Sequence, residues 1–485
     1  RQQGYPGVSV IVVNLDGRVL LSECLESIAA QNYPPAQVRV ILVDNGSTDD
    51  SVAFVRKAFP RVQIVEAGRN LGFAAGCNLG ARQATGEFLA FLNNDARADP
   101  GWLRALVEAT HTDPEIACVA SKILDQDGTA IDFVGTAMNL SGRAFQLDED
   151  LPASPGWYDE AGEVPAPCGA AMLVRRHLFW QLGGFDEEFI AYYEDVDLGW
   201  RLWLAGYKVW FAPGAVAYHL KHQTGAAFPL EQRYTLSETN ALRMLIKNLD
   251  EQNLGRVLPF SLFMGVKRSV EQAGLDRASY RFGSPANSNA ETGELEPEPR
   301  MSRVAASYLV AIDQIGEELP RLMQARKLVQ SSRKRSDEEI FARFPMRHGP
   351  MIFPWRRYHV VEDQLAQSLG VPEVLQPKHG SRLLIITHEA IGPKMAGPGI
   401  RAWEMACALA EQFEVLLAAP GQPDRHHNRV RLLGYKASDP HHAQLRAYLT
   451  AADAVLVMGS LLTKLPPLQD LGKPTIVDLY DPFEL

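Results

Sequence analysis

The sequence has little cysteine, no long apolar run and no excess of positive charge. Its five cysteines are widely scattered and include no Cys-x-x-Cys pair, which disfavours both a disulfide framework and a structural zinc site. The longest aliphatic stretch, around residues 10–13, is far shorter than the roughly 18 residues that a membrane-spanning helix needs. The formal net charge is −10, so we do not expect a protein that coats nucleic acid.

The composition is that of an ordinary globular protein with a long chain. Hydrophobic residues make up 46% and charged residues 22% of the 485 residues, which excludes wholesale disorder and collagen-like repeats. At roughly 100–200 residues per domain, this length favours two to four domains. The chain starts at Arg1, and no signal peptide precedes the first expected strand. We expect a reduced, cytoplasmic protein, with the inner face of the membrane as an alternative location, and a piece of a longer chain.

Residues 1–245 alternate between strand-like and helix-like patterns. Apolar, β-branched runs predict buried strands at 8–13, 38–43, 62–65 and 88–92. Apolar residues at helical spacing predict helices around 21–28, 51–59 and 72–85. This alternation predicts an α/β fold with a doubly wound sheet and right-handed crossovers, whose ligands bind at the carboxyl ends of the strands.

The remainder divides into two parts. Residues 246–380 have the pattern of a mainly helical linker, with helices expected at 245–270 and 304–329 and a disordered loop near 284–300. Residues 381–485 alternate again and predict a second, Rossmann-like unit. Its expected elements are strands at 382–386, 415–418, 454–458 and 475–478, and a helix at 400–411 that follows a Gly/Pro loop at 392–399.

Two polar clusters follow predicted strands of the first unit. Asp44 opens the run Asp-Asn-Gly-Ser-Thr, and a carboxylate at a strand end can accept hydrogen bonds from a ribose or a base N–H. The alternative is a turn whose Ser and Thr cap the next helix.

Asn93, Asn94 and Asp95 end another strand, a suitable place for a hard cation that bridges a diphosphate. The alternative there is a plain strand-to-loop turn.

An acidic cluster and a histidine come later in the same unit. Glu194, Asp195 and Asp197 place three carboxylates within four residues, and such crowding can raise one pKa and create a general base. A compatible alternative is the acidic start of a helix over 197–205. His219 ends an apolar stretch, where a metal or phosphate role and a packed structural role are both open.

Taken in order, these motifs resemble the GT-A fold glycosyltransferases of family 2, and within them the rhamnosyltransferase-like members that build bacterial surface polysaccharides. The resemblance covers about residues 8–235 and rests on VSVIVVN, VDNGSTDDS, NLGFAAGCNLG, FLNNDA, CGAAMLVRR, GGFDEEFIAYYEDVDLGWRLWLAGYKVWFAP and AYH. It implies a GT-A nucleotide-sugar-binding domain and an inverting, metal-dependent glycosyltransferase. The implied donor is a UDP- or dTDP-sugar, and the implied acceptor is a hydroxyl of a saccharide or lipid-linked saccharide.

The resemblance also implies roles for particular residues. Asp195 would be the general base, with Glu194 beside it in the Glu-Asp motif. Asp95 and His219 would hold Mg²⁺ or Mn²⁺ on the donor diphosphate. Asn93 is a departure, because it stands where the family motif has its first Asp and lowers the negative charge of the site. The implied contacts to the nucleotide sugar are Asn14, Asp44, Asn45, Asn94, Asp95, Cys168 and Gly169.

Residues 381–485 resemble the N-terminal half of GT-B glycosyltransferases of family 4, through RLLIITHE, AGPGIRAWEMACALAEQFEVLLAAP, AVLVMG and VDLYDPFEL. That resemblance implies a truncated half domain, inactive alone because the donor-binding half is missing. Two other classes stay open for the chain: a nucleotidyltransferase and a catalytically inactive carbohydrate-binding scaffold. We expect no nucleic-acid partner and at most a peripheral contact with a membrane.

Overall fold

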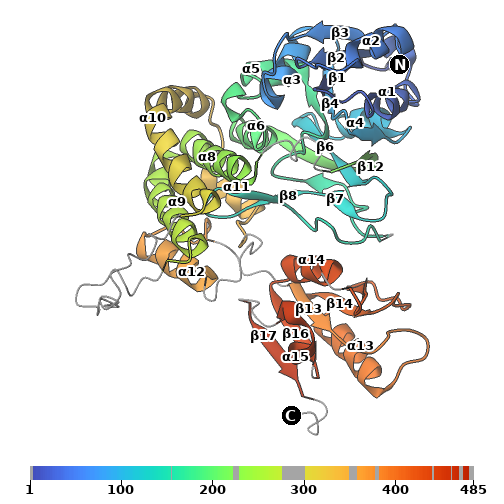
Figure 1. Cartoon of the computed structure of the whole chain (residues 1–485), viewed down its shortest axis with the longest axis vertical. Helices are drawn as coiled ribbons and strands as arrows, with labels where there is room; N and C mark the ends of the chain where they lie inside the picture. Colours follow the sequence, from blue (N-terminus) through green and yellow to red (C-terminus); the bar gives the residue numbers. More distant parts are fainter. Residues whose placement is uncertain are drawn as a thin grey trace, which may run out of the picture.

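The computed structural model contains two α/β units and a layer of helices (Figure 1). It describes residues 4–154, 156–221, 229–275, 301–348, 358–376, 382–439, 442–459, 461–468 and 473–479. The expected disordered loop at 284–300 lies outside these ranges. Within them, no helix combines the length and the apolar character needed to cross a bilayer. All five cysteines fall in the described ranges and are unpaired, as the sequence predicts.

One half of the first sheet is parallel, as the sequence predicts. Its strands, in spatial order, are β3 (Gln63–Glu66), β2 (Val38–Asp44), β1 (Val8–Asn14) and β4 (Phe88–Leu92). Asn14 and Asp44 are level with each other in the register of β1 and β2, so the polar residues that end these strands lie side by side. The connecting helices are α1 (Leu21–Ala29), α2 (Ser51–Ala58), α3 (Phe73–Arg82) and α4 (Trp102–Ala109).

The other half of the sheet is mixed, and for this half the predicted doubly wound sheet is wrong. The described strands follow the path β10-β12-β6-β11-β4-β1-β2-β3, and β11 (Ala171–Arg175) is antiparallel to both of its neighbours. The long connection from β6 to β11 contains short strands and no described helix, whereas a parallel return usually runs through a crossover helix. The remaining strands are β5 (Ala96–Ala98), β6 (Ile116–Asp125), β7 (Ile131–Phe133), β10 (Gly162–Glu163) and β12 (Lys208–His219), with a separate hairpin of β8 (Thr136–Met138) and β9 (Ala144–Gln146).

The helical layer lies to the left of the first sheet in Figure 1. The single helix expected at 245–270 is wrong, because Asp250 accepts a hydrogen bond from the Asn253 amide and caps a new helix there. The expectation for 304–329 is confirmed by α10. The helices of this layer are α8 (Leu230–Asn248), α9 (Glu251–Gln272), α10 (Arg303–Ser331), α11 (Asp337–Arg343) and α12 (Tyr358–Ser368). Two further helices, α5 (Arg176–Gln181) and α6 (Glu194–Leu204), belong to the first unit.

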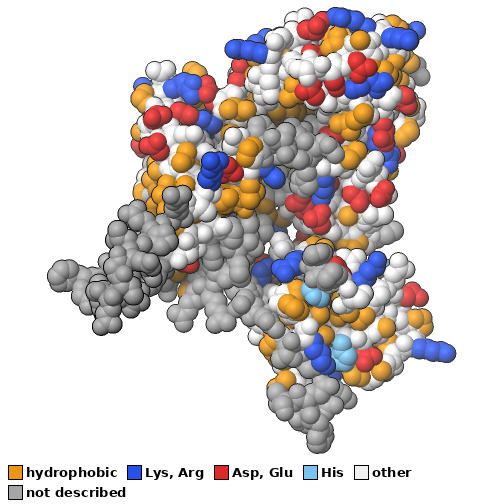
Figure 2. Space-filling model, in the orientation of Figure 1, with side chains coloured by type: hydrophobic (Ala, Val, Ile, Leu, Met, Phe, Trp, Pro, Cys, Tyr) orange, Lys and Arg blue, Asp and Glu red, His pale blue; other side chains and the backbone are white. Residues whose placement is uncertain are grey.

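The helical layer shares a hydrophobic core with the first unit. Leu245 of α8 and Phe260 of α9 are buried in the same cluster as Leu198 of α6. On the face shown in Figure 2, acidic and basic side chains are intermixed over the first unit and the helices, with no large area of one sign. The helices therefore do more than link two units: they complete the packing around α6.

The second unit is a parallel sheet, and its described strands follow the order β15-β14-β13-β16-β17. All four predicted strands are present, while β15 and α14 were not predicted. The helix expected at 400 begins earlier, at Gly397, with a proline in its first turn. The elements are β13 (Arg382–Ile386), α13 (Gly397–Leu409), β14 (Glu414–Pro420), β15 (Val430–Tyr435), α14 (Ala443–Ala451), β16 (Ala454–Met458), α15 (Leu461–Lys464) and β17 (Thr475–Asp478).

The two units meet at the loop that follows β9. Arg431 of β15 is fully buried and donates hydrogen bonds to the Tyr158 hydroxyl (2.9 Å) and the Pro152 carbonyl (2.6 Å). Leu151 of the same loop is buried among apolar side chains of the second unit. Arg382 of β13 forms an ion pair with Asp148. The loop is thus held by both apolar and ionic contacts.

Candidate active site

A cavity of about 290 Å³ lies beside the start of α6, and Asn93 and His219 line it from the ends of β4 and β12. The β8–β9 hairpin, the segment before β11, and the turn before α6 with the first turn of α6 supply most of the other lining, together with Phe73 of α3 and Phe133 of β7. Cys168 and Gly169 lie in the segment before β11, and Glu194 and Asp195 lie in the first turn of α6. Residues predicted from distant parts of the sequence therefore share one cavity.

The turn that precedes the acidic pair, Glu194 and Asp195, has an unusual backbone conformation. Tyr192 and Tyr193 both have left-handed backbone conformations, with φ of 66° and 73°, which bulky residues rarely adopt. Asn240 of α8 holds this turn, since its side-chain amide donates to the carbonyls of Phe189, Ala191 and Tyr192. Helix α6 then begins at Glu194, three residues earlier than the sequence predicts.

The two carboxylates of the pair differ in how they are held. Asp195 accepts hydrogen bonds from the Gly169 amide at Oδ2 and from the Val196 amide at Oδ1, each 2.7 Å long. Glu194 is buried, and its Oε2 has no hydrogen-bond partner among the described residues. Backbone donors therefore stabilise the negative charge of Asp195. The negative charge of an ionised Glu194 would have few such donors.

The pKa values of the pair follow from these contacts. Burial raises the pKa of Glu194 well above its ordinary value, and the charge of Asp195 raises it further. Burial also raises the pKa of Asp195, but the amides of Gly169 and Val196 oppose that effect. Asp195 is therefore the member of the pair that ionises first, and its pKa lies above that of an exposed aspartate.

Asp197 does not belong to this cavity. Its side chain is fully buried and forms ion pairs with Arg201 of its own helix (2.7 Å) and Lys247 of α8 (3.1 Å). Although burial opposes it, the attraction of Arg201 and Lys247 lowers the pKa of Asp197. Asp197 therefore stabilises the packing of α6 on α8 as a permanent carboxylate.

His219 lies between two carboxylates. Its Nε2 is 3.1 Å from Oδ1 of Asp95, and its Nδ1 is 2.7 Å from Oδ2 of Asp132. Burial disfavours the imidazolium, but the hydrogen bonds to Asp132 and Asp95 outweigh burial and raise the pKa of His219 to about 9. Asp132 is not among the residues that the sequence predicts for the site, although it stands as a lone carboxylate between the apolar residues Ile131 and Phe133.

The chemistry of these donors fits a divalent cation completed by substrate oxygens. Asp95 and His219 converge, and the buried Oδ1 of Asn93 has no partner among the described residues. The amide nitrogen of Asn93 is 3.5 Å from His219 Nε2, so a half-turn of that amide would bring its oxygen to the same place. Across the described ranges, no group of three or more His, Cys, Asp or Glu side chains forms a preformed metal site. Mg²⁺ and Mn²⁺ commonly take few protein ligands and fill the rest with phosphate oxygens and water.

The predicted nucleotide residues form a second polar cluster at the ends of β1 and β2. Asn94 donates to Asn14 (2.9 Å), Asn14 donates to Ser47 (3.2 Å), and the Ser47 amide donates to Asp44 (3.3 Å). None of Asn14, Asp44 and Asn94 lines the cavity of Asp195. The two clusters are joined through the chain, because Asp95, which contacts His219, follows Asn94 directly.

Asn45 has a different position from the other predicted nucleotide residues. Its side chain donates to Asn70 (3.1 Å) and to the Gly72 carbonyl (3.1 Å), and it accepts from the Leu71 amide (3.0 Å). These bonds hold the loop that leads into α3. The amide of Asn45 is therefore engaged in positioning that loop.

Comparison with known proteins places the first unit among sugar-transferring enzymes. Residues 9–183 match the model of glycosyl transferase family 2. The chain is 31% identical over 239 residues to N-acetylglucosaminyl-diphospho-decaprenol L-rhamnosyltransferase of Mycobacterium tuberculosis, covering 44% of this chain and 77% of that protein. It is 33% identical over 223 residues to O-antigen biosynthesis protein RfbC of Myxococcus xanthus, covering 43% of this chain but only 17% of that protein. Among solved structures, GalNAc-T7 with UDP, GalNAc and Mn²⁺ is similar with a TM-score of 0.43 and 18% identity, covering 66% of this chain and 58% of that one.

The α/β fold and the family match together define a glycosyltransferase. The chain belongs to glycosyltransferase family 2, and its relatives include rhamnosyltransferases and O-antigen biosynthesis proteins. The family match ends at residue 183, before the acidic pair, and does not extend to the second unit.

Proposed function

We propose that this protein is an inverting, metal-dependent glycosyltransferase that moves a sugar from a nucleoside-diphosphate sugar to a hydroxyl of a saccharide acceptor. The observation that carries the proposal is the shared cavity: Asp195, held by two backbone amides, lines the same cavity as His219, which contacts Asp95. His219 lines this cavity, whereas its partner Asp95 does not. A base and a cation-binding histidine on one cavity are what a single displacement at an anomeric carbon needs.

Asp195 is the general base of this proposal. Its carboxylate takes the proton of the acceptor hydroxyl while that oxygen bonds to the anomeric carbon and the bond to the diphosphate oxygen breaks. Because attack comes from the face opposite the leaving group, one displacement inverts the anomeric configuration. Glu194, whose burial raises its pKa well above the ordinary value, would act beside it as a neutral hydrogen-bonding group.

Asp95 and His219, with the unpartnered oxygen of Asn93, would hold Mg²⁺ or Mn²⁺. The cation would supply positive charge that stabilises the departing diphosphate. Asn14, Asp44 and Asn94 would contact the nucleotide of a UDP- or dTDP-sugar, and Cys168 and Gly169 the transferred sugar and the acceptor. Asn45 would support the nucleotide pocket through the loop that precedes α3.

For the acceptor, we propose a saccharide or lipid-linked saccharide of bacterial surface polysaccharide synthesis. Support comes from the relative of Mycobacterium tuberculosis, which is named for rhamnosyl transfer to a lipid-diphosphate-linked sugar. We place the protein in the cytoplasm or at the inner face of the membrane, with at most a peripheral membrane contact and no nucleic-acid partner. We further propose that the second unit is the acceptor-contacting half of a GT-B transferase, supported by its parallel sheet and the Gly-Pro-Gly start of α13.

A panel of UDP- and dTDP-sugars, incubated with saccharide acceptors and Mn²⁺, tests the proposal. The expected product is nucleoside diphosphate, released by the wild-type chain and strongly reduced in Asp95→Ala. In a separate reaction with a nucleoside triphosphate and a sugar 1-phosphate, release of pyrophosphate would instead identify a nucleotidyltransferase. Binding of saccharide without any donor turnover would identify an inactive carbohydrate-binding scaffold.

A further inference from the structure

We propose that Asp132 is a positioning residue for the metal-binding imidazole: it fixes the orientation and tautomer of His219 so that Nε2 faces the cation. This inference rests on the proposed function, because it needs a cation at Asp95 and His219. Asp132 itself lies on the far side of the imidazole ring from Asp95, so it acts through His219 and does not touch the cation.

The first observation is where Asp132 lies. It is the middle residue of β7, which pairs with the end of β6, and its neighbours Ile131 and Phe133 are fully buried. Asp132 itself is only 3% exposed. A buried carboxylate in a short apolar strand costs free energy unless it has specific partners, and here the partners are His219 and Lys221.

The second observation is the geometry at His219. Asp132 Oδ2 is 2.7 Å from Nδ1 of His219, and Asp95 Oδ1 is 3.1 Å from Nε2. A carboxylate can only accept, so Nδ1 carries the proton that it donates to Asp132. Asp95 accepts from Nε2 in the same way, and a bound cation would take the place of that second proton while Asp132 keeps the first on Nδ1. Second carboxylates placed in this way on metal-binding histidines typically strengthen metal binding 10- to 100-fold.

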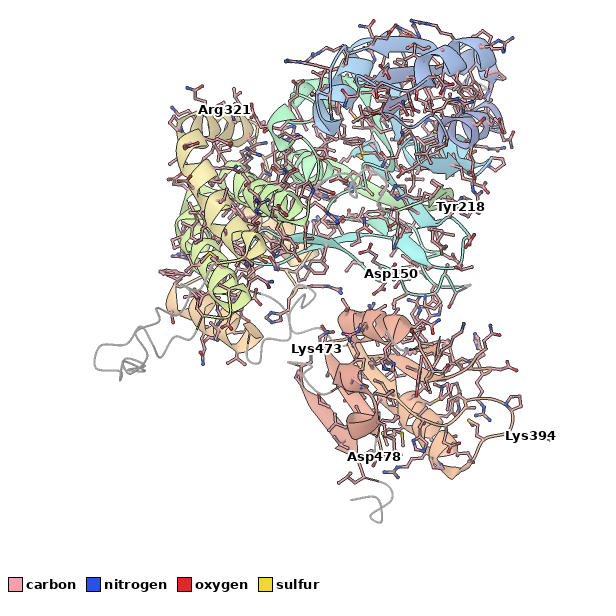
Figure 3. All side chains as sticks on the ribbon, viewed as in Figure 1. Asp150, Tyr218, Arg321, Lys394, Lys473 and Asp478 are labelled. Carbon is pink, nitrogen blue, oxygen red and sulfur yellow. The ribbon has the colours of Figure 1, made fainter. Side chains whose placement is uncertain are left out.

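The third observation is that the other oxygen of Asp132 is also engaged. Oδ1 lies 3.5 Å from Nζ of Lys221, which in turn contacts Asp150 (2.6 Å) and Glu149 (3.4 Å). Figure 3 labels Asp150 at the edge of the first unit that faces the second. Lys221 holds the second oxygen of Asp132 on the side away from His219, so Oδ2 stays directed at Nδ1. Asp150 provides a matched control, because it contacts the same lysine but not His219.

The test is Mn²⁺ binding followed by electron paramagnetic resonance on the full chain, without donor and with UDP or dTDP added. We expect Asp132→Asn to weaken Mn²⁺ binding about 10- to 100-fold, and Asp150→Asn to leave it within about twofold. In turnover assays, the Mn²⁺ concentration for half-maximal rate should rise by the same factor, while the rate at saturating Mn²⁺ falls less. If Asp132→Asn does not fold, Asp132→Thr is the second variant: its shorter, neutral side chain leaves Nδ1 of His219 without a carboxylate partner and should give the same rise.

A double-mutant cycle separates positioning from a general structural role. If Asp132 acts through His219, Asp132→Asn should have no further effect on Mn²⁺ affinity in a His219→Gln background. Unchanged Mn²⁺ affinity in Asp132→Asn, or equal losses with and without His219, would overturn the role of Asp132 while leaving the metal site intact. Absence of Mn²⁺ binding by the wild-type chain in every arm would instead overturn the metal site itself, and this inference with it.

Discussion

The backbone amide of Gly169 donates a 2.7 Å hydrogen bond to Oδ2 of Asp195. This bond ties the first turn of α6 to the segment that leads into β11, so two walls of the cavity are fixed to each other. It also stabilises the ionised carboxylate in a buried place, which a general base requires.

Replacing Asp195 with Asn should remove the base and keep the shape of the site. Because general-base catalysis contributes about 10²- to 10⁴-fold, turnover should fall by that order. Donor affinity, measured by calorimetry, should change by less than about threefold because the side chain is nearly the same size. Glu194→Gln is the matched control and should cost much less. A larger loss in Glu194→Gln than in Asp195→Asn would move the base to Glu194.

The pH dependence of turnover should reveal the raised pKa of Asp195. The carboxylate must be ionised to accept a proton, so activity should rise with pH through this pKa, and the acid limb should lie above the ordinary value of 3.8. Burial and the charge of Asp195 raise the pKa of Glu194 well above its ordinary value, so Glu194→Gln should leave the acid limb in place. A pH–rate profile of both chains checks this, and a limb that moves by more than about one unit in Glu194→Gln would contradict it.

His219 should make the metal-free protein less stable as pH rises. The folded state raises its pKa from 6.5 to about 9, so its contribution is fully present below pH 6.5 and is lost as the pH rises through 9. At about 1.4 kcal/mol per pKa unit, the loss is about 3 kcal/mol. Urea denaturation of chelator-treated protein, followed by tryptophan fluorescence below and above this window, measures it. His219→Gln should lose markedly less stability over the same window, and equal losses would show that other groups cause the effect.

Arg431 should be important for holding the loop at 148–158 to the second unit. Arg431→Ala removes the hydrogen bonds to Tyr158 and Pro152 and leaves a cavity in a fully buried place. Hydrogen bonds that involve a charged group contribute about 1.5–3 kcal/mol each, so the thermal transition of the second unit should shift to clearly lower temperature. Arg429→Ala, two residues away and exposed, should leave the transition almost unchanged. Similar shifts in both variants would mean that the buried contacts of Arg431 add no stability.

Much of this fold could be predicted because its signals are local. The strands β1 to β4 are short apolar runs, and the polar residues that end them are adjacent in sequence to the strands themselves. The acidic pair could be found for the same reason. The antiparallel direction of β11 could not, because it depends on a long connection without a clear periodic pattern.

The residues that were missed or misjudged depend on contacts between distant parts of the chain. Asp132 contacts a histidine 87 positions later, and the residues near it in the sequence do not indicate that contact. Asp197 looked equivalent to Glu194 and Asp195, but Lys247, 50 positions later, makes it part of the packing. The break between α8 and α9 could not be predicted, because residues at apolar helical spacing continue across Asp250. The cap that Asp250 provides for α9 depends on a single hydrogen bond from the Asn253 amide.

The central claim is that the cluster at Asp44 and the cluster at Asp95 and Asp195 form one sugar-nucleotide site. Calorimetric titration of UDP and dTDP, with and without Mn²⁺, tests it most directly on the wild-type chain and three variants. Tight, Mn²⁺-dependent binding should be lost in both Asp44→Ala and Asp95→Ala and retained in Asp195→Asn. Nucleotide binding that is unchanged in Asp44→Ala, or insensitive to Mn²⁺ and to Asp95→Ala, would contradict a single site.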